Sequence, residues 1–477
     1  MKLNIALGAL SLGILCAITS CSLDSDYSTY TYSDDTAITA VSFGKLTRTM
    51  HTTTKAGKDS TYISTYTGSV YPISIDQKTR TIFNADSLPY GTDPAKILLS
   101  VSTKNSASAY LVKGDTAYTF IQSTDTIDFT NQQKIAVVSQ DGQNRCDYKM
   151  TVTVHKEDAD SFTWSPAVTD DVIKTMENVR AVALNDKIFC LGTKFDTTPG
   201  YTEEAAADLL CSSINGAFAP SVVRSFAKNA QITASDNDIY VLSNGTLCSS
   251  SDEGATWNDV ANAEIASLVA AYNNVVYAIN NAGTLVESAD NGVTWTASAV
   301  DEKDAPLPTK NACAFVQKVK TNDDMTRLTI IGTPADDSQA YATVWSRLYD
   351  GTLDSAADWM YQPWEPSNSY KLAALGGLST TSYGEYMLAI GELRASIGKD
   401  GETADYAQIY TSIDHGLTWK NDKSFRLPKG FEVKKASNAA IVADKNNILW
   451  IICGGTGQVW HGRLHRMTWK EQQTYFQ

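Results

Sequence analysis

The stretch Ser288-Ala289-Asp290-Asn291-Gly292-Val293-Thr294-Trp295 recurs in two variant copies, at 250–257 and at 412–419. All three copies fit the pattern S-x-D-x-G-x-T-W. The pattern describes a turn, because an Asp carboxylate accepts hydrogen bonds from N–H groups of its own turn and Gly adopts a conformation that a Cβ resists. Thr adds a hydroxyl, and Trp has a large ring to bury against a neighbouring strand. Three such turns predict a repeated β-hairpin unit.

The pattern resembles the Asp-box, or BNR repeat, of sialidase-like β-propellers. In that family the box closes the turn between the third and fourth strands of a blade and lies on the periphery, away from the central site. The resemblance implies a propeller fold and a structural role for the box residues Asp252, Gly254, Trp257, Asp290, Gly292, Trp295, Asp414, Gly416 and Trp419. It implies no activity by itself, since fold does not determine function.

A longer phrase recurs around the boxes: a strand of small residues, a polar turn, and an apolar strand that ends in an aromatic residue. Copies lie at 181–189, 232–240, 269–277 and 440–450, and looser copies begin near 312 and 372. Six phrases, most of them at periods of roughly 37–60 residues, predict about six blades, with seven as the alternative. We expect the propeller at 160–477, with Phe162-Thr163-Trp164 as an edge strand that closes the ring.

Residues 36–157 carry a different pattern. Apolar and polar residues alternate at 37–43, 69–75 and 96–101, and the runs 134–139 and 148–154 flank Asp141-Gly142. Period-2 alternation predicts half-buried strands, and Asp-Gly between two such runs predicts a hairpin. A β-sandwich of about 120 residues fits, and the closing hairpin resembles bacterial immunoglobulin-like domains. The expected fold class is therefore all-β, an Ig-like β-sandwich followed by a β-propeller.

The N-terminus is typical of a targeting segment. Lys2 precedes an apolar run at 3–18 that is shorter than a membrane span. The run ends in Ile18-Thr19-Ser20-Cys21, which resembles a bacterial lipobox. The resemblance implies a signal peptide at 1–20, a diacylglycerol on Cys21 and a lipidated tether at 21–35.

Acidic residues in the tether and one later segment indicate where in the cell the protein is located. Asp24 and Asp26 resemble the surface-export signal of Bacteroidetes lipoproteins. Residues 84–93 resemble a stretch of a gut Bacteroidetes lipoprotein family of unknown function, which has an Ig-like domain followed by a propeller. That resemblance covers nearly the whole mature chain. It implies an outer-membrane lipoprotein that faces the cell surface, with a periplasm-facing arrangement as the alternative.

The composition of the chain limits the kinds of partner that it is expected to bind. The 477 residues carry a formal charge of −14. This charge disfavours binding of nucleic acid and binding of anionic lipid through a polybasic segment. No C-x-x-C pair occurs, so the cysteines are interpreted as small buried residues. His461 and His465 are interpreted as ordinary surface residues. We expect no metal and no cofactor; calcium at Asp/Asn-rich turns such as Asp170-Asp171 is a weaker alternative.

One functional hypothesis is a sialidase-like glycoside hydrolase. That chemistry needs three arginines, a Tyr nucleophile with a Glu partner, and an Asp acid/base. The propeller region contains eight arginines and one Tyr/Glu-rich run, Tyr383-Gly384-Glu385-Tyr386. The family's Phe/Tyr-Arg-Ile-Pro signature is missing, and the nearest string, at 424–428, lies near the C-terminus. We therefore assign no catalytic residue.

The favoured hypothesis is non-catalytic recognition of a glycan or a surface protein through the propeller face, whose loops vary freely. The longest insertions lie at 303–310, 346–371 and 394–406. The middle one contains Trp359, Tyr361 and Trp364, which either form a stacking platform for sugar rings or fold back and bury the tryptophan. A structural subunit of an outer-membrane complex is a third hypothesis.

Overall fold

A computed structural model describes residues 31–53, 58–114, 117–194, 207–214, 217–261, 263–336, 340–363, 366–393, 404–434 and 437–468. Cys21 and the predicted signal peptide lie outside these residues. The chain divides into two compact units between Lys156 and Glu157. Strands are interrupted in the described part by short 3₁₀ turns: η1 (Gly68–Val70), η2 (Pro94–Lys96), η3 (Lys104–Ser106), η4 (Ile173–Thr175) and η6 (His465–Thr468). Across the described ranges no helix is long and apolar enough to cross a membrane.

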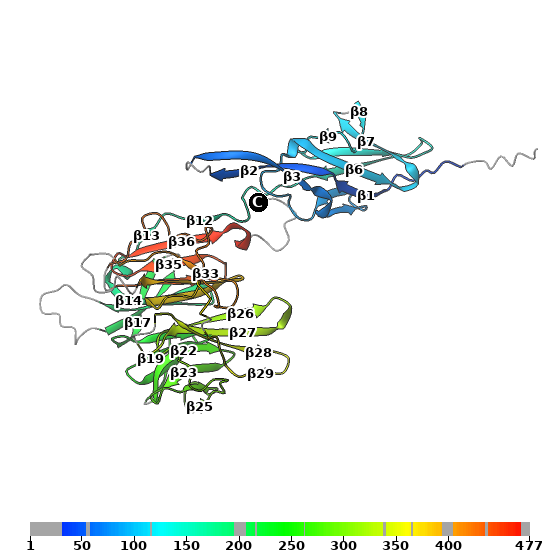
Figure 1. Cartoon of the computed structure of the whole chain (residues 1–477). Coiled ribbons are helices and arrows are strands. Elements are labelled where there is room, and N and C mark those ends of the chain that lie inside the picture. Colours follow the sequence, from blue (N-terminus) through cyan, green and yellow to red (C-terminus); the bar gives the residue numbers. More distant parts are fainter. Residues whose placement is uncertain are drawn as a thin grey trace, which may run out of the picture. The chain divides into compact units, whose positions relative to one another are not determined.

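The N-terminal unit is a sandwich of two sheets (Figure 1). The smaller sheet has the order β1 (Ile38–Phe43), β6 (Ile97–Thr103), β9 (Thr126–Ile127). The larger sheet has the order β4 (Ile73–Asp76), β5 (Thr81–Asn84), β11 (Arg145–Thr151), β10 (Gln133–Val138), β7 (Ser108–Lys113), β8 (Ala117–Phe120). Its pairs are antiparallel except β5 with β11. A separate ribbon consists of β2 (Lys45–Thr53) and β3 (Asp59–Thr67).

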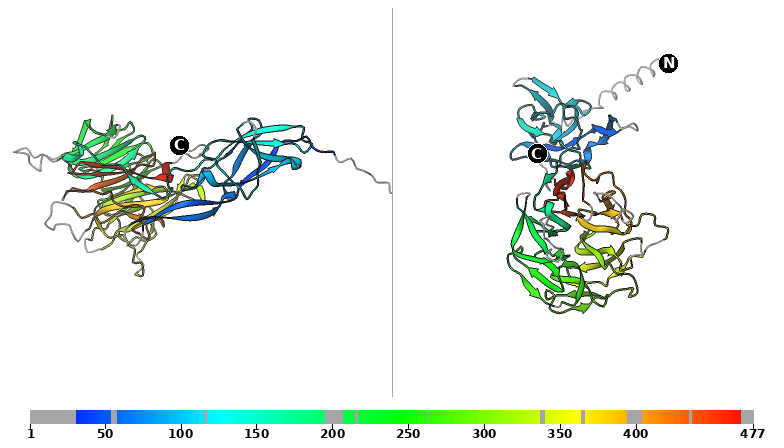
Figure 2. Two further views of the ribbon diagram at one scale, coloured as in Figure 1. Left: turned by 90° about the horizontal axis from the view of Figure 1, so that it is seen from above. Right: turned by 90° about the vertical axis from the view of Figure 1, so that its left-hand side faces the viewer.

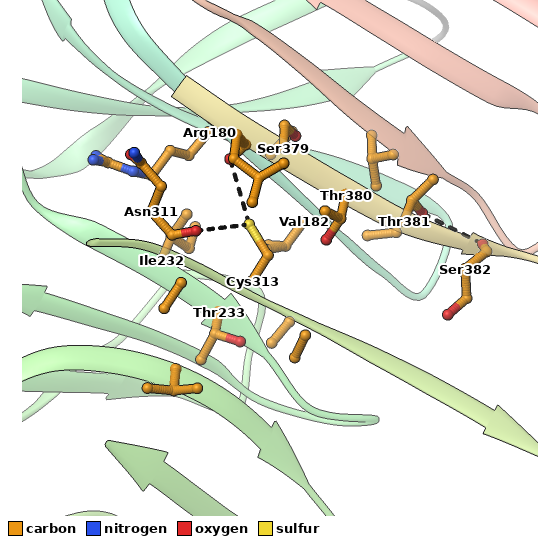
Figure 3. Close-up of a pocket in the computed structure, with 18 of the residues that line it drawn as sticks. Arg180, Val182, Ile232, Thr233, Asn311, Cys313, Ser379, Thr380, Thr381 and Ser382 are labelled. Carbon is orange, nitrogen blue, oxygen red and sulfur yellow. Dashed lines mark hydrogen bonds between the residues drawn. The ribbon is translucent and has the colours of Figure 1, made fainter. Parts of the chain in front are cut away.

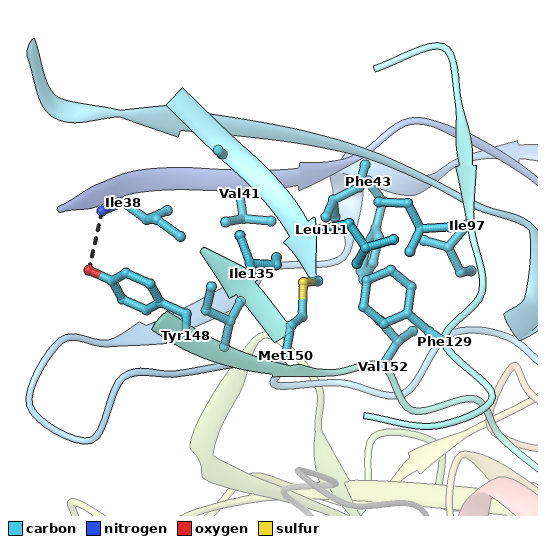
Figure 4. Close-up of a cluster of buried hydrophobic side chains, with 14 of the residues drawn as sticks. Ile38, Val41, Phe43, Ile97, Leu111, Phe129, Ile135, Tyr148, Met150 and Val152 are labelled. Atoms are coloured by element: carbon cyan, nitrogen blue, oxygen red, sulfur yellow. Dashed lines mark hydrogen bonds between the residues drawn. The ribbon is translucent and has the colours of Figure 1, made fainter. Parts of the chain in front are cut away.

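Alternate residues of the two sheets fill the space between them (Figure 4). Phe43 and Ile97 come from the smaller sheet, and Leu111, Ile135 and Met150 come from the larger one; all five are buried. The hydroxyl of Tyr148 lies at the end of this core and donates to Gln77 Oε1 at 2.7 Å. The period-2 pattern of the sequence therefore corresponds to one buried and one outward face.

Two sequence predictions for this unit have different outcomes. The closing hairpin is present as β10 and β11, with Gly142 at φ +72° in the connecting loop. The single strand predicted at 69–75 is wrong, because η1 occupies its first half and β4 starts only at Ile73. Pro72 precedes β4 and has no N–H group to donate to a ladder.

The second unit is a β-propeller. Its described residues form six sheets, each a blade that starts at its inner strand. Blades one to three are β14 (Met176–Leu184), β15 (Lys187–Lys194), β16 (Ala207–Ile214), β17 (Ala217–Ala227); β18 (Gln231–Ala234), β19 (Ile239–Ser243), β20 (Thr246–Ser250), β21 (Asn258–Val260); and β22 (Ile265–Tyr272), β23 (Val275–Asn280), β24 (Leu285–Ser288), β25 (Thr296–Ala297). Blades four to six are β26 (Lys310–Val319), β27 (Asn322–Thr333), β28 (Thr343–Asp350), β29 (Ser355–Ala356), with β30 (Met360–Tyr361) also on β28; β31 (Leu375–Tyr383), β32 (Tyr386–Leu393), β33 (Tyr410–Ser412); and β34 (Ala439–Ala443), β35 (Leu449–Cys453), β36 (Gln458–Leu464), β12 (Phe162–Trp164), with β13 (Val168–Thr169) also on β36.

The six blades close into a ring (Figure 2). The first strand of each blade contacts the first strand of the next, and β34 of blade six contacts β14 of blade one. The outermost strand of blade six is β12, which comes from the start of the unit and pairs antiparallel with β36. The predicted closing role of Phe162-Thr163-Trp164 and the count of six are therefore confirmed within the described chain.

The repeated phrase of the sequence corresponds to the first two strands of each blade. Its small residues lie on the inner strands, where the blades crowd the axis. Its aromatic residues lie on the second strands and are buried, as Phe189, Tyr240 and Tyr277 show. Neighbouring strands of a blade are antiparallel. The hairpins between first and second strands and the Asp-box turns between third and fourth strands therefore lie at one mouth of the ring. The connections between second and third strands, and those from one blade to the next, lie at the opposite mouth.

Hydroxyl groups join the inner strands of blades five and six. Ser379 Oγ accepts a hydrogen bond from Ile441 N at 3.0 Å, and Thr381 Oγ1 accepts one from Ala443 N at 3.0 Å. These N–H groups belong to β34, whose inner edge has no ladder partner in the sheet order. A buried donor without an acceptor costs about 1–3 kcal/mol, so the small polar residues of β31 contribute to ring closure.

Candidate ligand-binding sites of the propeller

The three Asp-boxes have one common geometry. In the second box, Asp290 Oδ1 accepts from Thr294 N at 2.9 Å, and Asp290 Oδ2 accepts from Thr294 Oγ1 at 2.6 Å. Ser288 Oγ donates to Asp290 at 2.7 Å and accepts from Gly292 N at 2.8 Å. Equivalent bonds hold the boxes of Asp252 and Asp414. These carboxylates are occupied by their own turns, at the ends of β20, β24 and β33.

Two consecutive residues of each box have positive φ. In the second box these are Asn291 at +58° and Gly292 at +88°, and the other boxes place Glu253 and His415 before their glycines in the same way. A Cβ on Gly292 would lie 2.3 Å from Leu247 Cδ2, so a larger residue would also require the Leu247 side chain to move. The tryptophans pack inward: Trp419 is buried, and its Nε1 donates to Gly416 O at 3.0 Å. The hydroxyl and the backbone N–H of Thr294 lower the pKa of Asp290 to about 2.

The aromatic insertion at 346–371 is largely not a free loop. It contains the end of β28 together with β29 and β30, which complete blade four. Trp359 has no exposed surface, and its ring meets Tyr277 edge-on at 5.5 Å. An indole without an exposed face cannot stack on a sugar, so the stacking interpretation is wrong for Trp359 and the buried alternative holds. Tyr361 is half-buried against Trp345, and Trp364 lies outside the described residues.

Residues from all six inner strands line a cavity of about 400 Å³ on the propeller axis (Figure 3). Most of the lining is small or hydroxyl-bearing, as in the run Ser379–Ser382. Arg180 is the charged residue of the described lining, and its NH1 donates to Ala230 O at 2.7 Å. Burial raises the pKa of Cys313 to about 11, so this thiol stays protonated at neutral pH. The cavity offers one cation and no described carboxylate.

The residues of the sialidase hypothesis do not converge in the described structure. Tyr383 is buried; its hydroxyl donates to Asn447 O at 2.8 Å and accepts from Leu464 N at 2.9 Å. Glu385 forms ion pairs with Lys320 and Arg466 at the rim. Other arginines pair within their own neighbourhoods: Arg224 with Asp259, Arg347 with Glu287, and Arg463 with Glu157. Arg394 lies outside the described residues.

A polar groove of about 470 Å³ lies between blades three and four. Arg347 of β28 is buried at its floor, where NH1 donates to Glu287 Oε2 at 2.8 Å and Nε donates to Ala357 O at 2.9 Å. The rim carries Tyr349, which hydrogen-bonds Asp354 and accepts from Asn273 Nδ2. Sequence reasoning missed this groove, because its side chains come from two blades and no local motif joins them.

A second groove, of about 360 Å³, lies between blades four and five and is mostly apolar. It is lined by Val344, Leu372 and the last residues of the third Asp-box. The connection between the two blades runs along it, with Trp419 N donating to Tyr370 O at 2.7 Å. Leu417 of the box is 45% exposed here, which makes the rim of this groove accessible.

The turns suggested for calcium are satisfied by protein groups. Asp170 Oδ1 accepts from Val172 N and Ile173 N, and Asp170 Oδ2 accepts from Phe218 N at 2.9 Å. His461 meets the ring of Trp450 at 4.0 Å, and His465 Nε2 bonds Thr163 Oγ1 at 2.8 Å. In the part of the chain that the structure describes, no group of three or more His, Cys, Asp or Glu residues is placed to hold a metal ion.

Both units match known family models. Residues 41–152 match the N-terminal domain of DUF6242, a domain of unknown function, and residues 158–472 match the DUF6242 beta propeller domain. The chain belongs to the DUF6242 family. The matches describe the same two-part organisation as the structure. No curated protein matches the chain.

Solved structures similar to this DUF6242 chain include enzymes and a lectin. The Hadza microbial sialidase Hz136 is 10% identical with a TM-score of 0.39, over 88% of this chain and 90% of the sialidase. The SapL1 lectin in complex with alpha methyl fucoside is 14% identical with a TM-score of 0.38, over 59% of this chain and 90% of the lectin. The GH93 alpha-L-arabinofuranosidase of Fusarium graminearum is 12% identical with a TM-score of 0.36, over 63% and 98%. These neighbours have different activities, and none assigns a ligand to this chain.

Proposed function

We propose that this DUF6242 protein is a lipoprotein of the outer membrane whose propeller recognises a glycan or a surface protein without cleaving it. The observation that best supports recognition without cleavage is the composition of the axial cavity. It is built by all six blades, yet its described lining contains one arginine and no carboxylate. Glycoside hydrolysis needs a pair of carboxyl groups, or a Tyr–Glu pair with an acid, on either side of the scissile bond. Recognition needs only surface groups that contact the ligand.

The groove between blades three and four is the part of the propeller that best fits a polar ligand. It combines an aromatic rim with hydrogen-bond donors and acceptors from Asn273, Tyr349 and Asp354. Sites with a few convergent polar groups beside aromatic rings are typical of ligand pockets. Trp364, which follows blade four in the sequence, stays a candidate for stacking on a glycan. Tyr361 of β30, three residues before it, stays a second candidate.

Binding is tested on the mature chain with a glycan array, followed by titration of the best ligand. Tyr349→Ala and Trp364→Ala are each expected to weaken binding of a propeller ligand, whereas Leu353→Ala, an exposed residue of the same turn as Asp354, is the matched control. Hydrolysis of sialosides or arabinofuranosides by the wild-type chain would instead favour the glycoside hydrolase hypothesis. A specific outer-membrane protein partner with no glycan bound would favour the assembly hypothesis.

The proposed location rests on the lipobox-like end of the targeting segment, which includes Cys21. Cells that express Cys21→Ser are expected to lose incorporation of labelled fatty acid into the protein and to release it from the membrane. Digestion of the wild-type protein by protease added to intact cells tests whether it faces the surface. Protection from the protease would place it on the periplasmic side. The Ig-like relationship of the N-terminal sandwich belongs to the same proposal.

A further inference from the structure

The outer face of the larger sheet in the N-terminal unit carries three neighbouring aromatic rings. Tyr110 of β7 lies opposite Phe120 of β8, and Tyr118 of β8 lies opposite Val112. Tyr118 is 44% exposed and Phe120 is 53% exposed, although both are large apolar side chains. The intervening residues of β7, Ala109 and Leu111, point into the core instead. The aromatic face is therefore set by strand register and has no part in the sandwich core.

The three rings form a stepped surface. Tyr110 meets Phe120 at a centroid distance of 5.8 Å and an interplanar angle of 75°. It meets Tyr118 at 6.5 Å and 85°. Edge-to-face packing of this kind is favourable, and Tyr118 and Phe120 keep about half of their surface exposed to solvent.

A row of charged residues borders the rings on the next two strands. Ala136 of β10 lies between Tyr110 on one side and Asp147 on the other, so Asp147 is on the aromatic face. Arg145 Nε and NH2 donate to the two oxygens of Asp147 at 2.7 and 3.0 Å. The same guanidinium lies 4.8 Å from the centroid of the Tyr118 ring and hydrogen-bonds its hydroxyl. The charged row and the rings are thus one continuous surface.

The row has an excess of positive charge. Lys134 lies directly opposite Lys149 on this face, and Lys134 Nζ is 3.7 Å from Asp147 Oδ2. Register places three cations (Arg145, Lys134 and Lys149) and two anions (Asp147 and, on β4, Asp76) on this face of the larger sheet, in a chain of net charge −14. Both lysines are exposed, and Asp147 is already neutralised by Arg145. A ligand that contacts the rings therefore meets the ammonium groups of Lys149 and of Lys134, which shares the carboxylate of Asp147 with Arg145.

We propose that this sheet face is a second binding site, which takes an acidic polysaccharide. The apolar CH faces of the sugar rings lie on Tyr118 and Phe120, and the carboxylate or sulfate groups meet Lys134, Lys149 and the outer edge of Arg145. Exposed apolar patches beside charged groups mark interaction sites, and charge-assisted hydrogen bonds orient the ligand. The site lies wholly within the N-terminal unit and does not depend on the function proposed for the propeller.

The test is affinity electrophoresis and calorimetric titration of the full mature chain. The probes are polygalacturonate, which carries uronate, and dextran sulfate, which carries sulfate; unmodified dextran is the neutral control. We expect binding of at least one acidic polymer and little of dextran, with weaker binding as ionic strength rises to about 0.15 M, because the contacts are exposed. The two acidic arms identify which anionic group the lysines prefer.

The variants separate the two halves of the surface. Tyr118→Ala with Phe120→Ala is expected to weaken binding by about tenfold or more, since two stacking rings are lost. Lys134→Gln with Lys149→Gln is expected to remove the preference for acidic polymers over dextran. Thr119→Ala, on the same strand but the opposite face, is the matched control and is expected to bind as the wild type does. Thermal unfolding should match the wild type in all three, because the changed side chains are exposed.

The proposal is overturned if neither acidic polymer binds, or if binding survives loss of both rings. Stronger binding of oligothymidylate than of either polysaccharide would also overturn it and reassign the face to nucleic acid. Tyr349→Ala in the propeller is expected to leave this binding unchanged, so failure here and failure of the propeller proposal are distinguishable.

Discussion

Phe162 of β12 and Leu464 of β36 are direct partners in an antiparallel ladder, although they lie at opposite ends of the propeller sequence. The same ladder sets Thr163 against Arg463 and Trp164 against Gly462. A short N-terminal strand therefore completes the last blade, and the ring is closed by backbone hydrogen bonds. Because each blade packs on the next, a weak closure is expected to destabilise the whole unit.

Gly462→Ala tests this closure. An added Cβ would lie 2.6 Å from Phe162 Cε1 and 2.6 Å from Trp164 Cε3, so the rings must move. We expect a loss of about 1–3 kcal/mol in the free energy of unfolding, measured by urea denaturation. Combination with Phe162→Ala relieves the overlap with Phe162 but not the one with Trp164, so the double variant should lose less than the sum of the single variants. Additive losses would contradict the predicted overlap.

Arg347→Met tests the ion pair that joins blades three and four. The Arg347 side chain is 6% exposed, and its guanidinium lies between Glu287 and the rings of Tyr277 and Trp359. Loss of a buried pair's partner costs up to about 3–5 kcal/mol; since Glu287 is 31% exposed and regains water, we expect about 2 kcal/mol.

Glu287→Gln is the complementary change, because it leaves the guanidinium buried without its counter-charge but keeps an acceptor. We expect a loss at least as large as for Arg347→Met, because the guanidinium that stays is the more deeply buried partner, and a double-mutant cycle should show coupling between the two sites. Equal unfolding midpoints for the wild type and Arg347→Met would contradict a stabilising role for this pair.

Asp290→Asn tests the Asp-box through its pH dependence. The folded-state pKa of Asp290 is lowered from its ordinary value to about 2, chiefly by the hydroxyl of Thr294. A lowered folded pKa means that the contribution is complete above the unfolded pKa and is lost as pH falls toward 2. Thermal unfolding between pH 5 and pH 2, at about one-unit steps, should show a shallower acid decline for the variant than for the wild type. Parallel declines would mean that the carboxylate does not stabilise the turn.

Thr381→Val tests the hydroxyls that join the inner strands. The change removes the acceptor for Ala443 N and keeps the shape of the side chain. We expect a loss of about 1–2 kcal/mol in unfolding free energy, because a partly buried N–H group loses its acceptor. Thr380→Val is the matched control: its Oγ1 is buried and has no hydrogen-bond partner among the residues that the structure describes, so the same substitution should be neutral or stabilising. Equal effects at the two positions would contradict the predicted role of Thr381.

The site was less predictable than the fold, for a physical reason. Strand period, turn residues and box spacing act over a few neighbouring residues, so the hairpins, the blade count and the closing strand could be inferred from the sequence. Burial is decided by packing between blades. Trp359 illustrates this: a tryptophan in a Pro-rich stretch has the composition of an exposed platform, and only its contact with Tyr277 of the preceding blade shows that it is covered. Arg347 and Glu287, far apart in sequence, carry no local signal at all.

The sequence by itself determined an all-β chain of two units and the Asp-box turns at Asp252, Asp290 and Asp414. It also determined that a strand from the start of the propeller completes the last blade. These features follow from local backbone chemistry, which a pattern of residues specifies directly. Only the tertiary structure decided which polar groups meet: one arginine on the axis, a groove between two blades, and an aromatic and basic face on the N-terminal sheet. Those groups converge through sheet register and blade packing, which depend on contacts between distant segments.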